Sequence, residues 1–215
     1  MSTEQSTQAV TESFSALKRF VRSSPPAEHC DLCGAVLEPV HSHLLERKNR
    51  RIVCGCEPCS ILFCDREDGK YMRIPRRPRL LKEFQFADLE WEEMTLPINL
   101  AFFFRDAEGH VKAAYPSPAG AIESQLPLSS LSDRFASVPE LAAMKPEVEA
   151  LLVNRVSGRS TPCMIAPIDE CFRLVGIIRM SWRGLSGGRE VWNAVDEFFD
   201  QLQRKAAGVL EERHA

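Results

Sequence analysis

The sequence has 215 residues, 44% of them hydrophobic, and a formal net charge of -3. A chain of this length can bury a hydrophobic core without help from a metal, and it suggests one to two domains. No apolar run approaches the roughly 20 residues that a membrane-spanning helix needs. Since no secretory signal is visible at the start either, we expect a cytoplasmic protein whose thiols stay reduced.

The first 79 residues are predicted to form a tail and a small module. Residues 8–22 place apolar side chains at helical spacing, which predicts a short amphipathic helix within a tail at 1–27. Residues 28–79 are predicted to form a cysteine-rich module, with "HLLE" and "RIVC" as the arms of a hairpin and "RKNR" as its tip. The stretch "RIPRRPR" follows as a basic linker, because its prolines cannot continue a central strand.

Residues 80–215 are expected to form a larger domain that begins with strands. Two strands are predicted on either side of "DAEG", where Gly109 suits a turn that needs positive φ. A third strand is predicted within 120–128. Residues 128–156 are predicted to be helical in several pieces, interrupted at two prolines.

The last part of this domain is predicted to contain further strands and a final helix. Residues 161–182 have β-type composition, with a turn at "PIDE" and a buried run "LVGII". Residues 188–206 are predicted to form an amphipathic helix, whose apolar face is expected to contain Val191, Val195, Phe198, Phe199 and Leu202. The predicted fold class is therefore α+β: a small zinc-ribbon or rubredoxin-like module with four cysteines, followed by an α+β domain with a mainly antiparallel sheet.

Two C-x-x-C pairs are the most specific local signal in the sequence. Cys30 and Cys33 form the first pair, Cys56 and Cys59 form the second, and 22 residues separate the pairs. Two residues between cysteines let a tight turn direct both thiolates at one metal ion, and two such turns complete a tetrahedral site with four sulfur ligands. The spacing therefore predicts one metal ion bound by these four side chains.

The ligand type does not decide which metal is bound, since zinc and iron both accept four thiolates in tetrahedral geometry. Zinc would be structural, whereas mononuclear iron would make a rubredoxin-like electron carrier. The second pair, "CEPCS", lacks the glycine that usually follows a rubredoxin knuckle, and the module holds few aromatic residues. We therefore expect Zn²⁺, with mononuclear iron as the alternative.

Three further side chains are candidate ligands. Cys54 precedes Cys56 by two residues, so on a strand both would point to the same face. Cys54 could replace Cys56 or help to build a second metal site. His41 and His43 share a face in the same way, and either one could ligate if the hairpin brings it near. Three other cysteines are expected to be small buried or half-exposed hydrophobic residues, namely Cys64, Cys163 and Cys171.

The larger domain shows no familiar catalytic motif. It lacks a dinucleotide-binding glycine pattern, a P-loop, a nucleophile elbow and a zinc-protease helix. We therefore expect no catalytic residues, and the chain is more consistent with a protein that is not an enzyme. A weaker candidate is an anion or partner contact at the start of the final helix, formed by Arg183, Ser186, Gly187, Gly188 and Arg189.

Several stretches together resemble one protein family: "CDLCG", "CGCEPC", "YPSPAGAIES", "VEALLVNRV", "PIDECFRLVGIIR" and "WRGLSGGREVW". This is an uncharacterised bacterial family, known mainly as a domain of unknown function, whose genes tend to lie beside actinobacterial-type nickel-iron hydrogenases. The resemblance runs from about residue 14 to residue 205. Its members resemble this chain at the five cysteines from Cys30 to Cys59 and at the histidine pair.

Two hypotheses from different classes follow. The resemblance implies a metal-binding accessory protein of a nickel-iron hydrogenase system, which would bind a hydrogenase subunit or a maturation factor during assembly or electron transfer. The alternative is a zinc-ribbon regulator that binds nucleic acid, with phosphate contacts from the basic clusters at 47–51 and 73–79. The acidic pI of about 6.0 argues against nucleic-acid binding and so favours the accessory-protein hypothesis.

Overall fold

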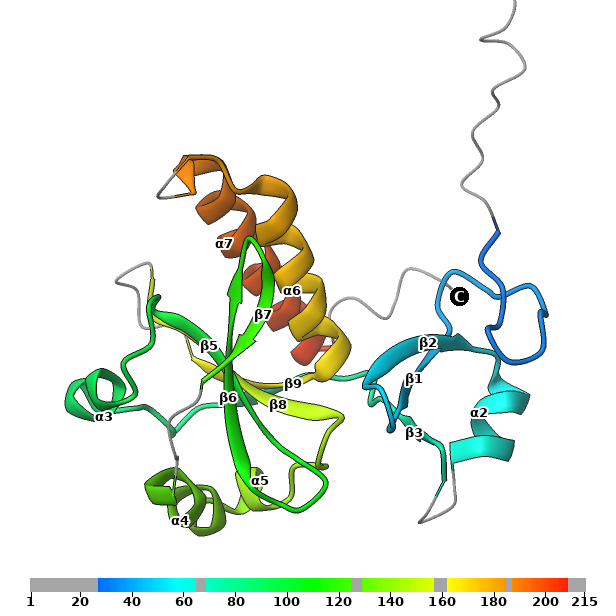
Figure 1. Cartoon of the computed structure of the whole chain (residues 1–215), viewed down its shortest axis with the longest axis horizontal. Helices are drawn as coiled ribbons and strands as arrows, with labels where there is room; N and C mark the ends of the chain where they lie inside the picture. The colour runs from blue at the N-terminus through cyan, green and yellow to red at the C-terminus, as the bar shows by residue number, and fades with distance from the viewer. Residues whose placement is uncertain (1–26, 65–68, 125–128, 157–161, 185–186, 209–215) are drawn as a thin grey trace, which may run out of the picture.

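The computed structural model describes residues 27–64, 69–124, 129–156, 162–184 and 187–208. Within them the chain forms a mixed α/β structure with two antiparallel sheets, a small one and a large one (Figure 1). The helix predicted over residues 8–22 lies outside the described residues. No described helix combines the length and the apolar character needed to cross a membrane.

The cysteine-rich module is built on the small sheet, with strand order β2-β1-β3. Its elements are β1 (Ser42–Glu46), β2 (Arg51–Gly55), α2 (Glu57–Cys64) and β3 (Tyr71–Arg73). The predicted hairpin is confirmed, since β1 and β2 pair antiparallel and leave residues 47–50 as the tip. Helix α2 was not predicted, and it begins directly after Cys56.

The larger domain contains a six-stranded sheet, with order β4-β9-β8-β5-β6-β7, in which all neighbouring strands are antiparallel. Its strands are β4 (Arg79–Leu81), β5 (Leu100–Arg105), β6 (Val111–Ser117), β7 (Gly120–Glu123), β8 (Glu149–Asn154) and β9 (Cys163–Pro167). The predicted pair around "DAEG" and the strand after it are confirmed as β5, β6 and β7. Gly109 has φ of 87°, so the turn uses the conformation that glycine tolerates best.

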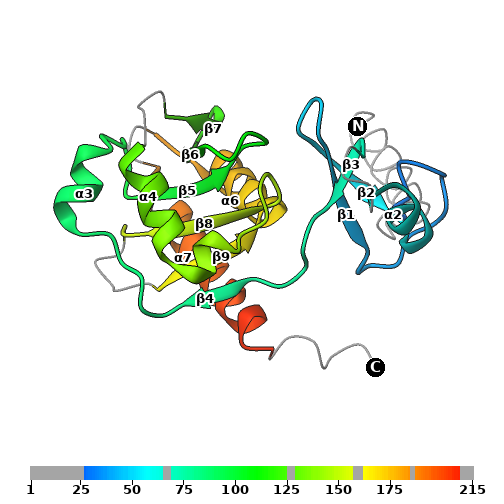
Figure 2. The ribbon, with the colours of Figure 1, turned by 90° about the horizontal axis from the view of Figure 1, so that it is seen from below.

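Helices cover both faces of the large sheet (Figure 2). Phe102 and Phe104 of β5 point to the face covered by α6 (Ile168–Ser181) and α7 (Gly188–Ala206). Phe103 points to the opposite face, where the helices are α3 (Asp88–Glu93), α4 (Ser129–Ser137) and α5 (Pro139–Ala142). Successive strand residues face opposite sides, so a sheet covered on both faces needs strands that are apolar at nearly every position.

Two predictions for the larger domain were wrong. Residues 149–154 form strand β8 and not a helix, and all six are buried. Its centre, residues 150–153, is apolar at every position, and so short an apolar run has no periodicity that separates a buried strand from a buried helix. Conversely, the stretch expected to be a turn followed by a strand is helix α6. Its buried residues Ile168, Cys171, Leu174, Val175 and Ile178 follow helical spacing, which the β-branched composition obscured.

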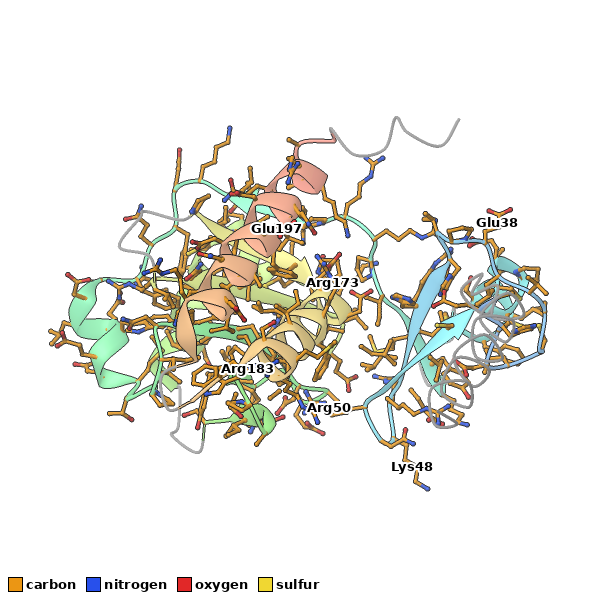
Figure 3. All side chains as sticks on the ribbon, turned by 90° about the horizontal axis from the view of Figure 1, so that it is seen from above. Glu38, Lys48, Arg50, Arg173, Arg183 and Glu197 are labelled. Atoms are coloured by element: carbon orange, nitrogen blue, oxygen red, sulfur yellow. The ribbon has the colours of Figure 1, made fainter. Side chains whose placement is uncertain are left out.

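The cysteine module packs against the larger domain. Leu45 and Ile74 are 1% and 2% exposed, and both belong to the core cluster that also contains the apolar faces of α6 and α7. At the hairpin tip, Arg50 donates to Glu123 of β7 at 2.6 Å and lies over the ring of Phe104. Figure 3 shows Arg50 turned towards the larger domain, while Lys48 extends away from it. A shared apolar core and ion pairs at the tip therefore join the two sheets.

Candidate metal centre

The first cysteine pair lies in a tight turn before the small sheet. The backbone N–H of Gly34 donates to the carbonyl of Cys30 at 2.8 Å, and Gly34 has φ of 75°. A residue with a β-carbon would be strained in this left-handed conformation, which explains the glycine after the pair. The N–H of Cys30 donates to the carbonyl of Ala35, which closes the turn from the other side. The turn thus directs both thiols of the pair to one side.

The second pair spans the junction between β2 and α2. Cys56 follows the last residue of β2, and Cys59 lies in the first turn of α2. The N–H of Ser60 donates to the carbonyl of Cys56 at 2.9 Å, so the helical turn itself separates the two cysteines. This pair needs no glycine after it, because it continues into a helix.

The four sulfur atoms of Cys30, Cys33, Cys56 and Cys59 all lie within 4.8 Å of one another. Those of Cys33 and Cys56 are 3.6 Å apart. Zinc–sulfur bonds of about 2.3 Å in a tetrahedron would separate the sulfurs by about 3.8 Å, so this spacing fits a four-thiolate site. Cys30 and Cys59 are buried, whereas Cys33 is exposed. We call this group the four-cysteine cluster; it could bind a metal ion, and it is compatible with a zinc-ribbon-like module.

The thiols of the four-cysteine cluster differ in their affinity for protons. Burial acts to raise the pKa of Cys30, but N–H donors of Cys56, Leu32 and Cys33 outweigh it and lower that pKa to about 6. Burial and the neighbouring thiols raise the pKa of Cys59 to about 12. Backbone donors therefore already stabilise the thiolate of Cys30, whereas Cys59 keeps its proton until a cation replaces it.

A second group of possible ligands lies beside the first. One donor atom from each of His41, His43 and Cys54 lies within 4.8 Å of the other two. The structure therefore places Cys56 among the four sulfurs and Cys54 with the two histidines. Cys54 is tied to the first cysteine turn, because its N–H donates to the carboxylate of Asp31 at 2.7 Å. Burial, followed by the charges of Asp31 and Glu28, raises the pKa of the Cys54 thiol.

The larger domain contributes a partner to this second group. Nδ1 of His43 lies 2.6 Å from a carboxylate oxygen of Asp169, in the first turn of α6. This hydrogen bond is the main reason why the pKa of His43 is raised. Sequence reasoning missed this role of Asp169, because the two residues are 126 positions apart and no local pattern connects them. It also missed a group at the β5–β6 turn, formed by half-buried Asp106 with exposed Glu108 and His110.

The candidate anion contact before α7 has a structural explanation. The guanidinium of Arg183 donates to the carbonyls of Met180 and Trp182, at the end of α6. A β-carbon on Gly187 would lie 2.8 Å from Val191 and 3.1 Å from the ring of Trp182, so close packing requires glycine there. Gly188 and Arg189 are exposed at the start of α7, and Ser186 lies outside the described residues. An anion or partner contact at this place stays a prediction.

Many arginines of the two basic clusters pair with carboxylates of the same chain. The pairs with an N···O distance of at most 3.3 Å are Arg47–Glu147, Arg50–Glu123, Arg73–Glu57 and Arg79–Glu149. The pairs of Arg47 and Arg50 join the module to the larger domain, whereas Arg73–Glu57 lies within the module and Arg79–Glu149 lies within the large sheet. These side chains thus already have anionic partners within the chain, and nucleic-acid binding stays a prediction.

Comparison with known proteins places the chain in one family. The model of a family of unknown function, DUF5947, matches residues 29–206, which include both ligand groups and nearly all of the larger domain. No curated protein and no solved structure matches the chain.

Proposed function

The chain belongs to the family of unknown function DUF5947, and from this premise we propose that it is a metal-binding accessory protein of a nickel-iron hydrogenase system. Its role would be in maturation, assembly or electron-transfer support, with a hydrogenase subunit or a maturation factor as its partner in the cytoplasm. The observation that supports metal binding is the four-cysteine cluster. The hydrogenase system is proposed on the family resemblance given by the sequence motifs.

Zinc is the metal that we propose for the four-cysteine cluster. Four thiolates leave no open position, as in sites where zinc has a structural role. Among the described residues, the apolar cluster around the sulfurs consists of Leu37 and Leu32 beside the cysteines themselves. So small a core gains stability when a metal joins its two halves, and apparent binding free energies in zinc-finger peptides reach about 10–16 kcal/mol.

Elemental analysis and absorption spectra of protein purified without oxygen test this proposal. We expect a colourless protein with one zinc ion per chain in the four-cysteine cluster, and Cys33→Ser should lose that ion. Cys163→Ser is a matched control, because Cys163 is buried in the core of the larger domain, and it should keep the zinc. A red protein that contains iron and bleaches on reduction would show that the four-cysteine cluster holds mononuclear iron instead of zinc. Protein that holds no metal when purified and takes up none when titrated would refute metal binding.

Deletion of the gene tests the proposed hydrogenase role. We expect reduced hydrogenase activity or incomplete processing of its subunits, which the wild-type gene should restore and the Cys33→Ser gene should not. Unchanged activity and processing after deletion would refute this role, whatever metal the purified protein contains. The nucleic-acid alternative predicts retention on DNA or RNA that falls steeply with salt, and no retention at low salt would exclude it.

A further inference from the structure

His41, His43 and Cys54 are brought together by the register of the β1–β2 hairpin. His43 and Cys54 are directly paired across the two strands, and paired residues of an antiparallel sheet project from the same face. His41 lies directly before β1, two residues before His43, and its ring lies beside that of His43, with the ring centroids 5.1 Å apart. Strand pairing thus brings together one imidazole and one thiol, the residue just before β1 adds the second imidazole, and the three donor atoms lie within 4.8 Å of one another.

Both histidines are held in the form that a metal ion requires. Nδ1 of His41 lies 2.9 Å from the backbone carbonyl of Glu38, which is labelled in Figure 3. A carbonyl only accepts hydrogen bonds, so Nδ1 carries the proton and Nε2 carries a lone pair. The carboxylate of Asp169 has the same effect on His43, through the contact of 2.6 Å to Nδ1. Ligating histidines commonly have such a carbonyl or carboxylate behind them, because it fixes the tautomer and the ring orientation.

The lone pair of His41 has no partner among the residues that the structure describes. The His41 side chain is only 8% exposed, and its Nε2 atom is buried and accepts no hydrogen bond from any of these residues. An unsatisfied buried polar atom costs about 1–3 kcal/mol, and folded proteins rarely keep one without a reason. A cation bound between the three side chains would satisfy this atom. The unpaired Nε2 atom therefore points to a bound ligand, and this argument does not depend on which residue types surround it.

We propose that His41, His43 and Cys54 form a second metal site, separate from the four-cysteine cluster, for a divalent transition-metal ion such as Zn²⁺, Co²⁺ or Ni²⁺. Two imidazoles and a thiolate suit these ions better than Mg²⁺ or Ca²⁺, which prefer oxygen ligands. Three protein ligands leave one position for water or an exchanging ligand, unlike the closed four-sulfur site. The use of this site in metal handling rests on the proposed accessory function, whereas its existence rests on these residues alone.

Asp169 makes the second site depend on both parts of the protein. All three ligands come from the module, but the carboxylate that orients His43 belongs to α6 of the larger domain. Asp169 is thus a positioning residue, since it acts on the metal through an imidazole. Loss of such a supporting hydrogen bond typically weakens metal affinity about 10- to 100-fold. We expect the second site to bind tightly only while the module stays packed against the larger domain.

The test is a titration of the full-length protein with Co²⁺ alone, after the four-cysteine cluster has been loaded with one zinc ion. We expect wild-type protein to bind one cobalt ion while its zinc content stays at one ion per chain. The spectrum should show a thiolate-to-cobalt charge-transfer band in the near ultraviolet and the strong visible bands of four-coordinate cobalt. These bands identify the sulfur ligand and the geometry directly.

Matched variants assign the ligands. His41→Ala and Cys54→Ser should weaken cobalt binding by more than the roughly 100-fold expected for a supporting group, and any cobalt left on Cys54→Ser should lack the charge-transfer band. His29→Ala and Cys64→Ser change the same residue types within the module but outside both sites, and they should bind cobalt as wild type does. Asp169→Asn should keep the band but weaken binding about 10- to 100-fold.

The proposal is overturned if zinc-loaded wild type binds no cobalt, if bound cobalt lacks the charge-transfer band, or if His41→Ala binds as tightly as wild type. Tryptophan-monitored unfolding and zinc content show whether each variant is folded. If Cys54→Ser does not fold, the comparison of His41→Ala with His29→Ala still shows whether His41 binds the cobalt ion. Cys33→Ser separates this inference from the proposed function when it is compared with Cys33→Ser/His41→Ala. Both should lose the zinc of the four-cysteine cluster, but only Cys33→Ser should bind the additional cobalt ion of the second site.

Discussion

Leu45 is the best residue with which to test the packing of the cysteine module on the larger domain. It lies on β1, is 1% exposed, and belongs to the same apolar cluster as the buried faces of α6 and α7. Leu45→Ala removes three carbon atoms, which at about 0.8 kcal/mol per buried methylene lowers the free energy of unfolding by roughly 2.4 kcal/mol. If the surroundings do not collapse into the cavity, the loss rises to about 5 kcal/mol.

Guanidinium denaturation monitored by tryptophan fluorescence measures this loss. Trp182 and Trp192 pack against the same cluster, so their signal follows the core that Leu45 shares with the larger domain. Leu62→Ala is the matched control: it makes the same truncation within the module, but Leu62 is 67% exposed. We expect a change below about 0.5 kcal/mol for this control. A change below about 1 kcal/mol for Leu45→Ala would refute the shared core.

Three further outcomes are expected. Burial acts to raise the pKa of Glu170, yet the hydrogen bond from Lys205 lowers it overall. Glu170→Gln should therefore lower the free energy of unfolding by about 1–3 kcal/mol at pH 7. In urea unfolding, this difference from wild type should shrink as the pH falls through the lowered folded-state pKa. A pH-independent difference would contradict this. Gly187→Ala should lower the thermal midpoint more than Gly184→Ala, because both have positive φ but only the first meets the ring of Trp182; equal shifts would contradict it. Chelation of the metal should abolish hydrogen-exchange protection around the four-cysteine cluster while tryptophan fluorescence stays native, since every tryptophan belongs to the larger domain; unchanged protection would show that the metal does not stabilise the module.

Much of the fold could be predicted because it depends on local patterns. The hairpin of the module, the β5–β6 pair around Gly109 and the apolar face of α7 all follow from alternation, turn residues or helical spacing within a short window. Strand β8 could not be predicted in this way. Helices cover both faces of the sheet, so β8 is buried at every position and loses the alternation that marks a strand.

The two candidate sites also differ in whether local sequence patterns or tertiary contacts determine them. The sequence alone determined the four-cysteine cluster, because two C-x-x-C pairs limit the geometry of their own turns and need only one hairpin to meet. Only the tertiary structure decided that Cys54 lies with the histidines and not among the four sulfurs, since this depends on strand register. Only the tertiary structure also decided that the carboxylate of Asp169 hydrogen-bonds to Nδ1 of His43. Such a contact forms when α6 packs beside the module, and no spacing along the chain encodes it.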